Sequence, residues 1–288
     1  MALRPPLNWV SRLVGRMHSR ETCCSVPAGA SVVAAAASIL SLTVACTDPL
    51  PLGSNIIWSA NHETGDVSEW SLDGDGAGYV TDSGSGYVVV SEQAHSGSYS
   101  VKLTSSANGE NVGAGLFRYM GSRDEAYFSA WYYLPRAYQT ISYWTIFRFQ
   151  PSSPTDPTTT ALGIDLNLRS LPEGQIVLYV LQQQPVHLQW PIADPAPYVA
   201  VGRWFQIEAN YRNATDNTGL LKVWLDGALV YDIEGQGIET TATGMAQDFY
   251  WTPCNFTSDM IPAPVEIYVD DAVISRTRVS IDGTTKLP

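Results

Sequence analysis

The stretch from Val201 to Ile233 constrains the fold of this chain more than any other segment. Residues 204–212 (WFQIEANYR) alternate apolar and polar side chains, and Leu221, Val223 and Leu225 share one face of the next segment. A period of two is typical of a strand with one buried and one solvated face. The dipeptide Asp226-Gly227 that follows is a strong signal for a tight hairpin turn. The sequence therefore predicts consecutive antiparallel strands.

Similar strand-like segments recur along most of the chain, separated by loops rich in Gly, Pro, Asp and Ser. They cover residues 94–104, 127–135, 143–150, 162–170, 175–184 and 265–275. No internal repeat and no segment of useful length with a helical period accompanies them. A chain of 288 residues with 15% charged residues has enough apolar material for one large core. We therefore expect an all-β protein, a single β-sandwich of two antiparallel sheets over residues 56–280, with a tail at 281–288.

The first 45 residues predict a secretory signal. Four arginines at positions 4, 12, 16 and 20 precede a charge-free segment over residues 26–45. The segment ends in LTVAC, which resembles a bacterial lipobox and would place a lipid on Cys46, followed by a tether at residues 46–55. The alternative is an ordinary signal peptide cut nearby. We expect an exported protein, a bacterial cell-surface or periplasmic lipoprotein or otherwise a secreted one, that meets the membrane only through its lipid anchor.

Charge and cysteine content limit the partners and the chemistry. The net charge of −12 disfavours binding to nucleic acid. Of the four cysteines, Cys254 alone would remain after export and lipidation, so no internal disulfide is expected. Cys254 has no histidine close to it in sequence, and we interpret it as a buried structural residue rather than a nucleophile. We expect a monomer.

Several motifs resemble known carbohydrate-active sandwiches. The Trp-bearing strand at 204–212, the polar loop NATDNTG and the VWLDG strand with its turn resemble the concanavalin A-like lectin/glucanase superfamily. Within it, the heparin lyase I-like polysaccharide lyases and laminin-G-type domains are similar. ETGDVSEW (63–70) resembles the opening strand of jelly-roll carbohydrate-binding domains and lyase-like sandwiches. The resemblance implies a concanavalin A-like jelly roll with a concave face that binds a polysaccharide.

Polar side chains on the predicted strands supply candidates for that face. They project away from the apolar side of their strands, and aromatic residues nearby offer surfaces for sugar stacking. The carbohydrate-binding candidates are Trp144, Asp165, Asn167, Arg169, Gln206, Glu208, Asn210 and Trp190. We place Trp144 on the same strand face as Arg148, and expect alanine at either position to weaken glycan binding with little effect on stability. The alternative is an ordinary solvated sheet face.

The chemistry of the face stays open between binding and catalysis. The Glu-x-Asp-x-x-Glu run of the superfamily's glucanases does not occur, which disfavours glycoside hydrolysis. A lyase needs a group that neutralises a uronate carboxylate, a base and an acid, and Arg148, Gln150, His187 and Tyr179 are the catalytic candidates. The superfamily's Lys-x-Gly-x-Tyr run is missing after the VWLDG hairpin. We therefore rank an exported carbohydrate-binding protein slightly ahead of a polysaccharide lyase acting on a uronate-containing glycan, with a non-catalytic structural or adhesive sandwich third.

A structural calcium ion is also expected, where the two ends of the domain meet. Glu63 and Asp66 in the opening motif and Asp270 or Asp271 in the last strand offer carboxylates. Asp271 shares its parity with Val269, so we expect Asp271 to point inward and Asp270 outward. The alternative is that Asp271 pairs with Arg276 or is solvated at a strand end.

Overall fold

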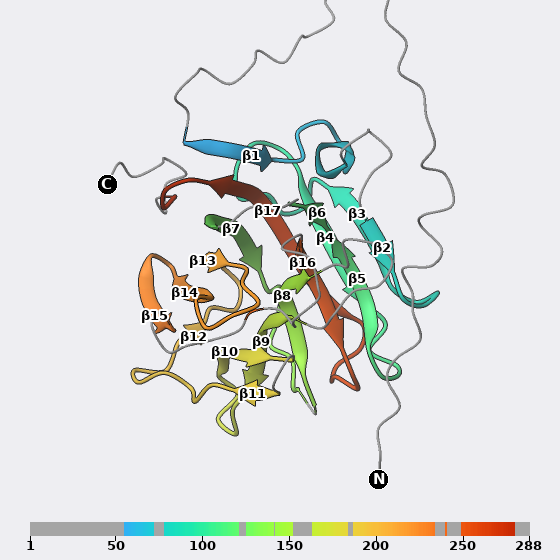
Figure 1. The fold of residues 1–288 in the computed structure, drawn as a ribbon. Coiled ribbons are helices and arrows are strands. Elements are labelled where there is room, and N and C mark those ends of the chain that lie inside the picture. Colours follow the sequence, from blue (N-terminus) through green and yellow to red (C-terminus); the bar gives the residue numbers. More distant parts are fainter. Residues whose placement is uncertain are drawn as a thin grey trace, which may run out of the picture.

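The protein is a β-sandwich of two antiparallel sheets, as the sequence predicts (Figure 1). The computed structural model describes residues 55–71, 78–120, 125–140, 142–151, 163–183, 187–233, 240 and 249–279. Within these ranges the helical content is one 3₁₀ turn, η2 (Ser68–Trp70). The expected signal peptide, the lipid site at Cys46 and the tail at 281–288 lie outside the described residues.

The first sheet has eight strands. In spatial order they are β15 (Ala228–Asp232), β14 (Leu220–Leu225), β13 (Trp204–Arg212), β7 (Glu125–Tyr133), β17 (Val265–Ser275), β4 (Ser100–Ser105) and β3 (Gly86–Val90), with β1 (Ile56–Ala60) also paired to β17. Figure 1 shows β1 running beside the end of β17. The opening and closing strands of the domain therefore meet, as expected.

The second sheet has nine strands. In spatial order they are β11 (Leu188–Gln189), β10 (Ile176–Gln182), β9 (Ile164–Ser170), β8 (Trp144–Pro151), β16 (Phe249–Thr257), β5 (Val112–Leu116) and β2 (Gly78–Val80). Two short strands complete it: β12 (Tyr198–Val199) pairs with β10, and β6 (Arg118–Tyr119) pairs with β16.

The predicted hairpin is present between β14 and β15. Asp226 and Gly227 both have positive φ, 48° and 77°. Two successive positive φ values are the requirement of a type I′ turn, whose twist matches that of the flanking strands. The local sequence therefore determines this turn.

Aromatic side chains from both sheets fill the space between the layers. On β13 the predicted apolar face is confirmed, because Phe205, Ile207, Ala209 and Tyr211 are all buried. Tyr211 stacks on Phe149 of the opposite sheet, with ring centroids 3.9 Å apart and an interplanar angle of 4°. Large buried rings of this kind dominate the energy of such a core. No helix within the described ranges has the length and apolarity needed to cross a membrane.

Candidate functional site

The outer face of the nine-stranded sheet gathers most of the predicted site residues. On β9, Ile164, Leu166 and Leu168 point into the core, so Asp165 and Asn167 between them point outward, as predicted. The pairing of β9 with β10 places Tyr179 opposite Asn167 and Val177 opposite Arg169 on this same face. The strand alternation alone thus brings cations, amides and a phenol together.

A buried ion pair lies at the centre of this face. Arg148 on β8 donates from Nε to Asp165 Oδ1 at 2.7 Å and from Nη2 to Asp165 Oδ2 at 3.1 Å. The Arg148 side chain is 8% exposed and that of Asp165 is 0% exposed. Burial opposes the charge of Arg148, but the attraction and hydrogen bonds of Asp165 outweigh it and raise the arginine pKa. Gln183 adds a third hydrogen bond to Asp165 Oδ2, at 3.0 Å. The Asp165 carboxylate is therefore hydrogen-bonded within the protein through both of its oxygens.

Next to the ion pair, the face is covered by apolar side chains. Tyr79, Cys254 and Phe256 form a small buried cluster with Phe117, separate from the main core. The Arg148 guanidinium lies 5.5 Å from the centre of the Phe256 ring. Cys254 is a free, buried thiol whose pKa is raised by burial, so it is structural, as the sequence predicts.

At the other end of the face, His187 and Gln189 are exposed and Arg169 is half-buried, whereas Tyr179 beneath Arg169 is 3% exposed. The Arg169 guanidinium stacks over the Tyr179 ring at 4.7 Å and donates to Gln189 Oε1 at 3.2 Å. Burial raises the pKa of Tyr179, and the nearby Arg169 charge partly opposes this. His187 is exposed and lies two residues before Gln189, just outside β11, so the strand period puts it on the same side. Arg169, Tyr179, Gln189 and His187 form what we call the open end.

The predicted placement of Trp144 is wrong. The pairing of β8 with β9 shifts between Thr145 and Phe147, so the simple alternation breaks within this strand. Trp144 is fully buried in the core and its Nε1 donates to Asn255 Oδ1 at 2.9 Å. Thr145 takes the outer position instead, where it donates to Asn167 Oδ1 at 2.7 Å. Trp144 therefore contributes to packing rather than to a sugar-binding surface.

Two further candidates are also buried. Gln150 shares the outward parity of Arg148 but is 4% exposed. Trp190 is 8% exposed and belongs to the main core cluster. Trp190 follows β11 directly, and its indole is used in packing rather than in stacking on a sugar.

Gln206, Glu208 and Asn210 do not share a groove with Arg148. They lie on β13, in the eight-stranded sheet, and face away from its core side. Glu208 accepts hydrogen bonds from Arg278 Nε, at 2.8 Å, and from the backbone N–H of Val279. Gln206 donates to Ser129 Oγ and Asn210 to the backbone carbonyl of Ala126, so all three are buried and bonded within the protein.

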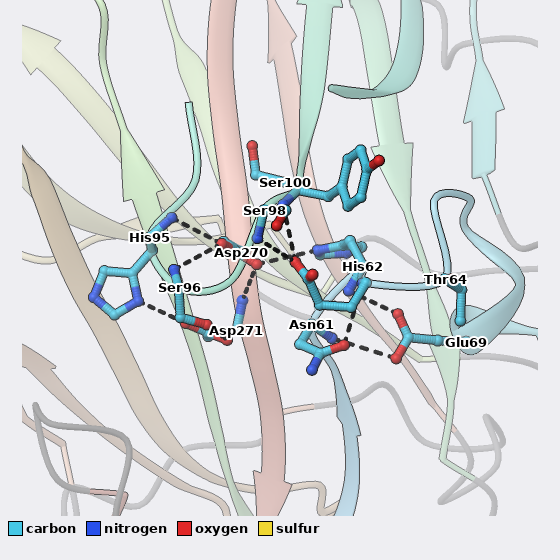
Figure 2. A network of polar contacts seen from close by, with 12 residues as sticks. Asn61, His62, Thr64, Glu69, His95, Ser96, Ser98, Ser100, Asp270 and Asp271 are labelled. Carbon is cyan, nitrogen blue, oxygen red and sulfur yellow. Dashed lines mark hydrogen bonds and ion pairs between the residues drawn. The ribbon is translucent and has the colours of Figure 1, made fainter. Parts of the chain in front are cut away.

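Three of the four expected calcium ligands, Glu63, Asp270 and Asp271, bind the loop between β3 and β4 in a polar network on the eight-stranded sheet (Figure 2). Figure 2 shows Asp270 at its centre, between His62 and the loop that carries His95 and Ser96. Asp270 accepts from the backbone N–H groups of His95, Ser96 and Asp271 at 2.9, 3.3 and 2.8 Å. Trp70 Nε1 donates to His62 Nε2, which leaves the proton on Nδ1, facing Asp270 Oδ1 at 3.4 Å.

The predicted orientation of the two aspartates is wrong. Asp270 is completely buried, whereas the Asp271 side chain is 23% exposed and contacts His95 Nδ1 at 2.6 Å. The cause is a shift in the pairing of β17 with β7 between Asp270 and Val273, where Asp271 has a φ of 44°. A β-bulge of this kind reverses the parity that the sequence indicates.

Of the residues expected to bind calcium from the opening motif, only Glu63 lies near Asp270. Glu63 accepts from the backbone N–H groups of Ser98 and Tyr99, so it reaches the same loop as Asp270. Asp66 instead accepts from Ser68 within its own turn. Among the described residues, no three His, Cys, Asp or Glu side chains are grouped as a metal site would require. Calcium binding stays a prediction.

The sequence did not indicate every residue that shapes the face. Gln183 and Gln189 belong to polar segments that the alternation leaves ambiguous, and Tyr79 is an isolated aromatic residue after a Gly/Asp-rich loop. The alternation of β16 could have identified Phe256. Trp251 and Asn255 point inward, so the even-numbered residues of this strand, Phe256 among them, point outward. No local signal identifies Tyr79.

Comparison with known proteins supports this fold and identifies the family of the chain. A family model described as polysaccharide lyase matches residues 62–252. The chain belongs to this polysaccharide lyase family. No curated protein gives a significant match.

Solved structures share the fold at low sequence identity. The endo-β-1,4-glucuronan lyase of the fungus Trichoderma reesei aligns with a TM-score of 0.57 and 15% identity, over 78% of this chain and 98% of that one. The cellulose-induced protein Cip1 gives 0.54 and 16%, over 77% and 98%. A variant of the alginate lyase Aly36B in complex with an alginate trisaccharide gives 0.53 and 15%, over 77% and 98%. The family match favours the lyase alternative over the binding protein that the sequence analysis ranked first.

Proposed function

We propose that this protein is a polysaccharide lyase that cleaves a uronate-containing glycan by β-elimination at the open end of the nine-stranded sheet. Membership of the polysaccharide lyase family supports the reaction class. The observation that carries the site is Arg169, stacked on Tyr179 and turned toward Gln189 at an accessible edge.

Arg169 is suited to hold the uronate carboxylate. Among the described residues it makes no ion pair with Asp or Glu, so its charge is available to a ligand. Arg148, in contrast, is held by Asp165 on two of its nitrogens and is nearly buried. A guanidinium binds a carboxylate through two parallel hydrogen bonds, and the Tyr179 ring fixes its plane. Neutralising the carboxylate makes the proton on the adjacent carbon easier to remove.

Tyr179 and His187 supply the proton transfers. Because burial raises the pKa of Tyr179, its phenol keeps its proton at neutral pH and acts as the acid. His187 takes the proton from the carbon beside the carboxyl group. The electron pair forms a carbon–carbon double bond, the bond to the glycosidic oxygen breaks, and Tyr179 protonates that oxygen. The products are two shorter chains, one of which ends in an unsaturated uronate.

The test is incubation with polyglucuronate and, separately, with alginate, following the ultraviolet absorbance of the unsaturated product. Arg169→Ala should lower kcat/KM roughly 10–100-fold, as expected for a lost hydrogen bond to a charged group. Tyr179→Phe keeps the ring beneath Arg169 but removes the acid, and should lower kcat with little change in KM. Arg203→Ala is the matched control, because Arg203 is 66% exposed and directly precedes β13 of the other sheet.

The same experiment separates catalysis from binding. If wild-type protein binds these polymers but never produces the absorbance, the protein is a binding module and the lyase proposal is wrong. If lysis occurs but Arg169→Ala matches wild type, the reaction takes place elsewhere.

Export and the lipid anchor are part of the same proposal. A lyase for an external polymer acts outside the cell, and the charge-free segment before Cys46 supports this location. Cys46→Ser should move the protein from the membrane fraction to the soluble fraction. Retention in the membrane at the wild-type level would contradict lipidation of Cys46.

A further inference from the structure

The outer face of the eight-stranded sheet carries a row of aromatic rings. Tyr133 on β7 pairs with Trp204 on β13 and with Tyr268 on β17, so the three side chains lie side by side across neighbouring strands. The ring centroids of Tyr133 and Trp204 are 5.5 Å apart, and those of Tyr133 and Tyr268 are 5.9 Å apart. Tyr132 and Phe205, one residue away, fill the core instead. The row therefore belongs to the surface of the sheet.

A second level of rings joins this row. Trp131 is two residues before Tyr133, on the same face, and His95 stacks on it with centroids 3.8 Å apart and an interplanar angle of 16°. The edge of His95 also meets Trp204, at 5.7 Å. Asp271 fixes the imidazole through Nδ1 and leaves Nε2 directed away from that contact. We call Trp131, Tyr133, Trp204, Tyr268 and His95 the aromatic platform.

The platform is accessible, although the outer face of an antiparallel sheet is usually polar. Trp131, Tyr133 and Trp204 are half-buried and the His95 side chain is 23% exposed, whereas Tyr268 is buried, at 6% exposed. Neither the core nor the proposed lyase site uses these rings. Half-exposed rings beside hydrogen-bonding groups are the chemistry that binds sugars, through stacking on apolar faces and bonds to hydroxyls.

Three cations beside the platform are paired with carboxylates within the protein, and Glu266, two residues before Tyr268 on the same strand face, adds a negative charge. Lys102 contacts Glu92 at 2.7 Å, Arg203 contacts Asp226 at 3.4 Å, and His95 contacts Asp271 at 2.6 Å. These cations already have carboxylate partners, so the platform offers a uronate chain no charge complement. An uncharged glycan needs no charge complement to bind there. A polyanion would in addition be repelled by the protein's net charge of −12.

We propose that the aromatic platform is a second glycan-binding site, specific for a neutral polysaccharide and separate from the lyase site on the other sheet. This goes beyond the proposed function, because it gives the protein a way to hold a neutral polymer while the opposite sheet acts on a charged one. The sugar rings lie against Trp131, Trp204 and Tyr133, and His95 Nε2 meets a hydroxyl.

Affinity electrophoresis of the full protein in gels containing hydroxyethylcellulose or galactomannan tests the proposal. At least one of these neutral polymers should retard wild-type protein, and Trp204→Ala and Trp131→Ala should each raise the apparent Kd about tenfold, the upper range for one aromatic contact. Trp131→Phe, which keeps a ring beneath His95, should retain most of the binding. Tyr198→Ala is the matched control, because Tyr198 is 52% exposed outside the platform.

Three results would overturn the proposal. Wild-type protein that migrates unretarded in both gels has no such site. Retardation that the platform variants leave unchanged, with thermal unfolding confirming their fold, places the binding elsewhere. A platform that instead pairs two copies of the chain would give a wild-type dimer and monomeric Trp204→Ala in sedimentation, without retardation. The lyase assay is independent, since Trp204→Ala should keep full activity on polyglucuronate and Arg169→Ala should keep full retardation.

Discussion

The Arg148–Asp165 pair allows a direct test of how the candidate face is built. We expect Arg148→Met and Asp165→Leu each to destabilise the protein strongly, although the sequence alone suggested a surface position for Arg148. Either change leaves the other partner buried without its counterpart. The Asp165 side chain is 0% exposed, so the carboxylate left by Arg148→Met has no access to water.

The expected magnitude follows from this burial. Breaking a buried pair by removing one partner costs about 3–5 kcal/mol, against roughly 0–1 kcal/mol for an exposed pair. For a domain of this size that corresponds to a fall in Tm on the order of 10 °C. Replacing both residues, as Arg148→Met with Asp165→Leu, removes both buried charges together. The double variant should therefore lie within about 1–2 kcal/mol of wild type.

Urea unfolding of the four proteins gives the coupling free energy between the two positions. Arg169→Met is the control, because Arg169 is half-buried on the same face with no carboxylate partner among the described residues, and it should cost less than about 1 kcal/mol. Single variants within about 1 kcal/mol of wild type, or a double variant at the sum of the two, would refute the buried-pair reasoning.

Three other predictions follow from the packing and from the polar network. Trp144→Ala should cost about 3–5 kcal/mol, since it empties a buried site and removes the donor to Asn255, and an unchanged urea midpoint would show that Trp144 is not in the core. Cys254 should resist alkylation in native protein and react after unfolding, because burial raises its pKa and blocks access, and peptide mapping that finds native labelling would contradict this. If calcium joins Glu63 to Asp270, EGTA should lower the Tm and calcium should restore it, whereas a Tm indifferent to both would end the calcium prediction.

The sequence predicts those parts of the fold that local rules control. Strict alternation over residues 204–212 identified the buried face of β13, and Asp226-Gly227 identified the hairpin turn. The same alternation placed Asp165 and Asn167 outward. In each case the period of two is unbroken, so the position of a residue along the strand determines which face of the sheet its side chain is on.

The predictions fail where a strand carries an irregularity. In β8 the pairing shifts near residue 146, and Trp144 turns into the core while Arg148 stays outside. In β17 the shift after Asp270 buries that carboxylate and exposes Asp271. A bulge adds one residue and inverts the parity beyond it, and neither sequence has a glycine or proline next to the shift that would reveal one.

Alternation also cannot say which sheet a strand joins, and this decides the chemistry of each face. Glu208 and Asp165 have the same strand pattern, yet they lie on opposite outer faces of the sandwich because long-range pairing assigns β13 and β9 to different sheets. Each carboxylate then finds its own arginine, Arg278 for Glu208 and Arg148 for Asp165. Both acids are neutralised internally. Arg169 on the nine-stranded sheet has no carboxylate partner among the described residues and can meet a charged substrate, whereas the outer face of the eight-stranded sheet presents aromatic rings. The two faces are therefore suited to different glycans, because a uronate chain requires the cation and a neutral chain requires only the rings.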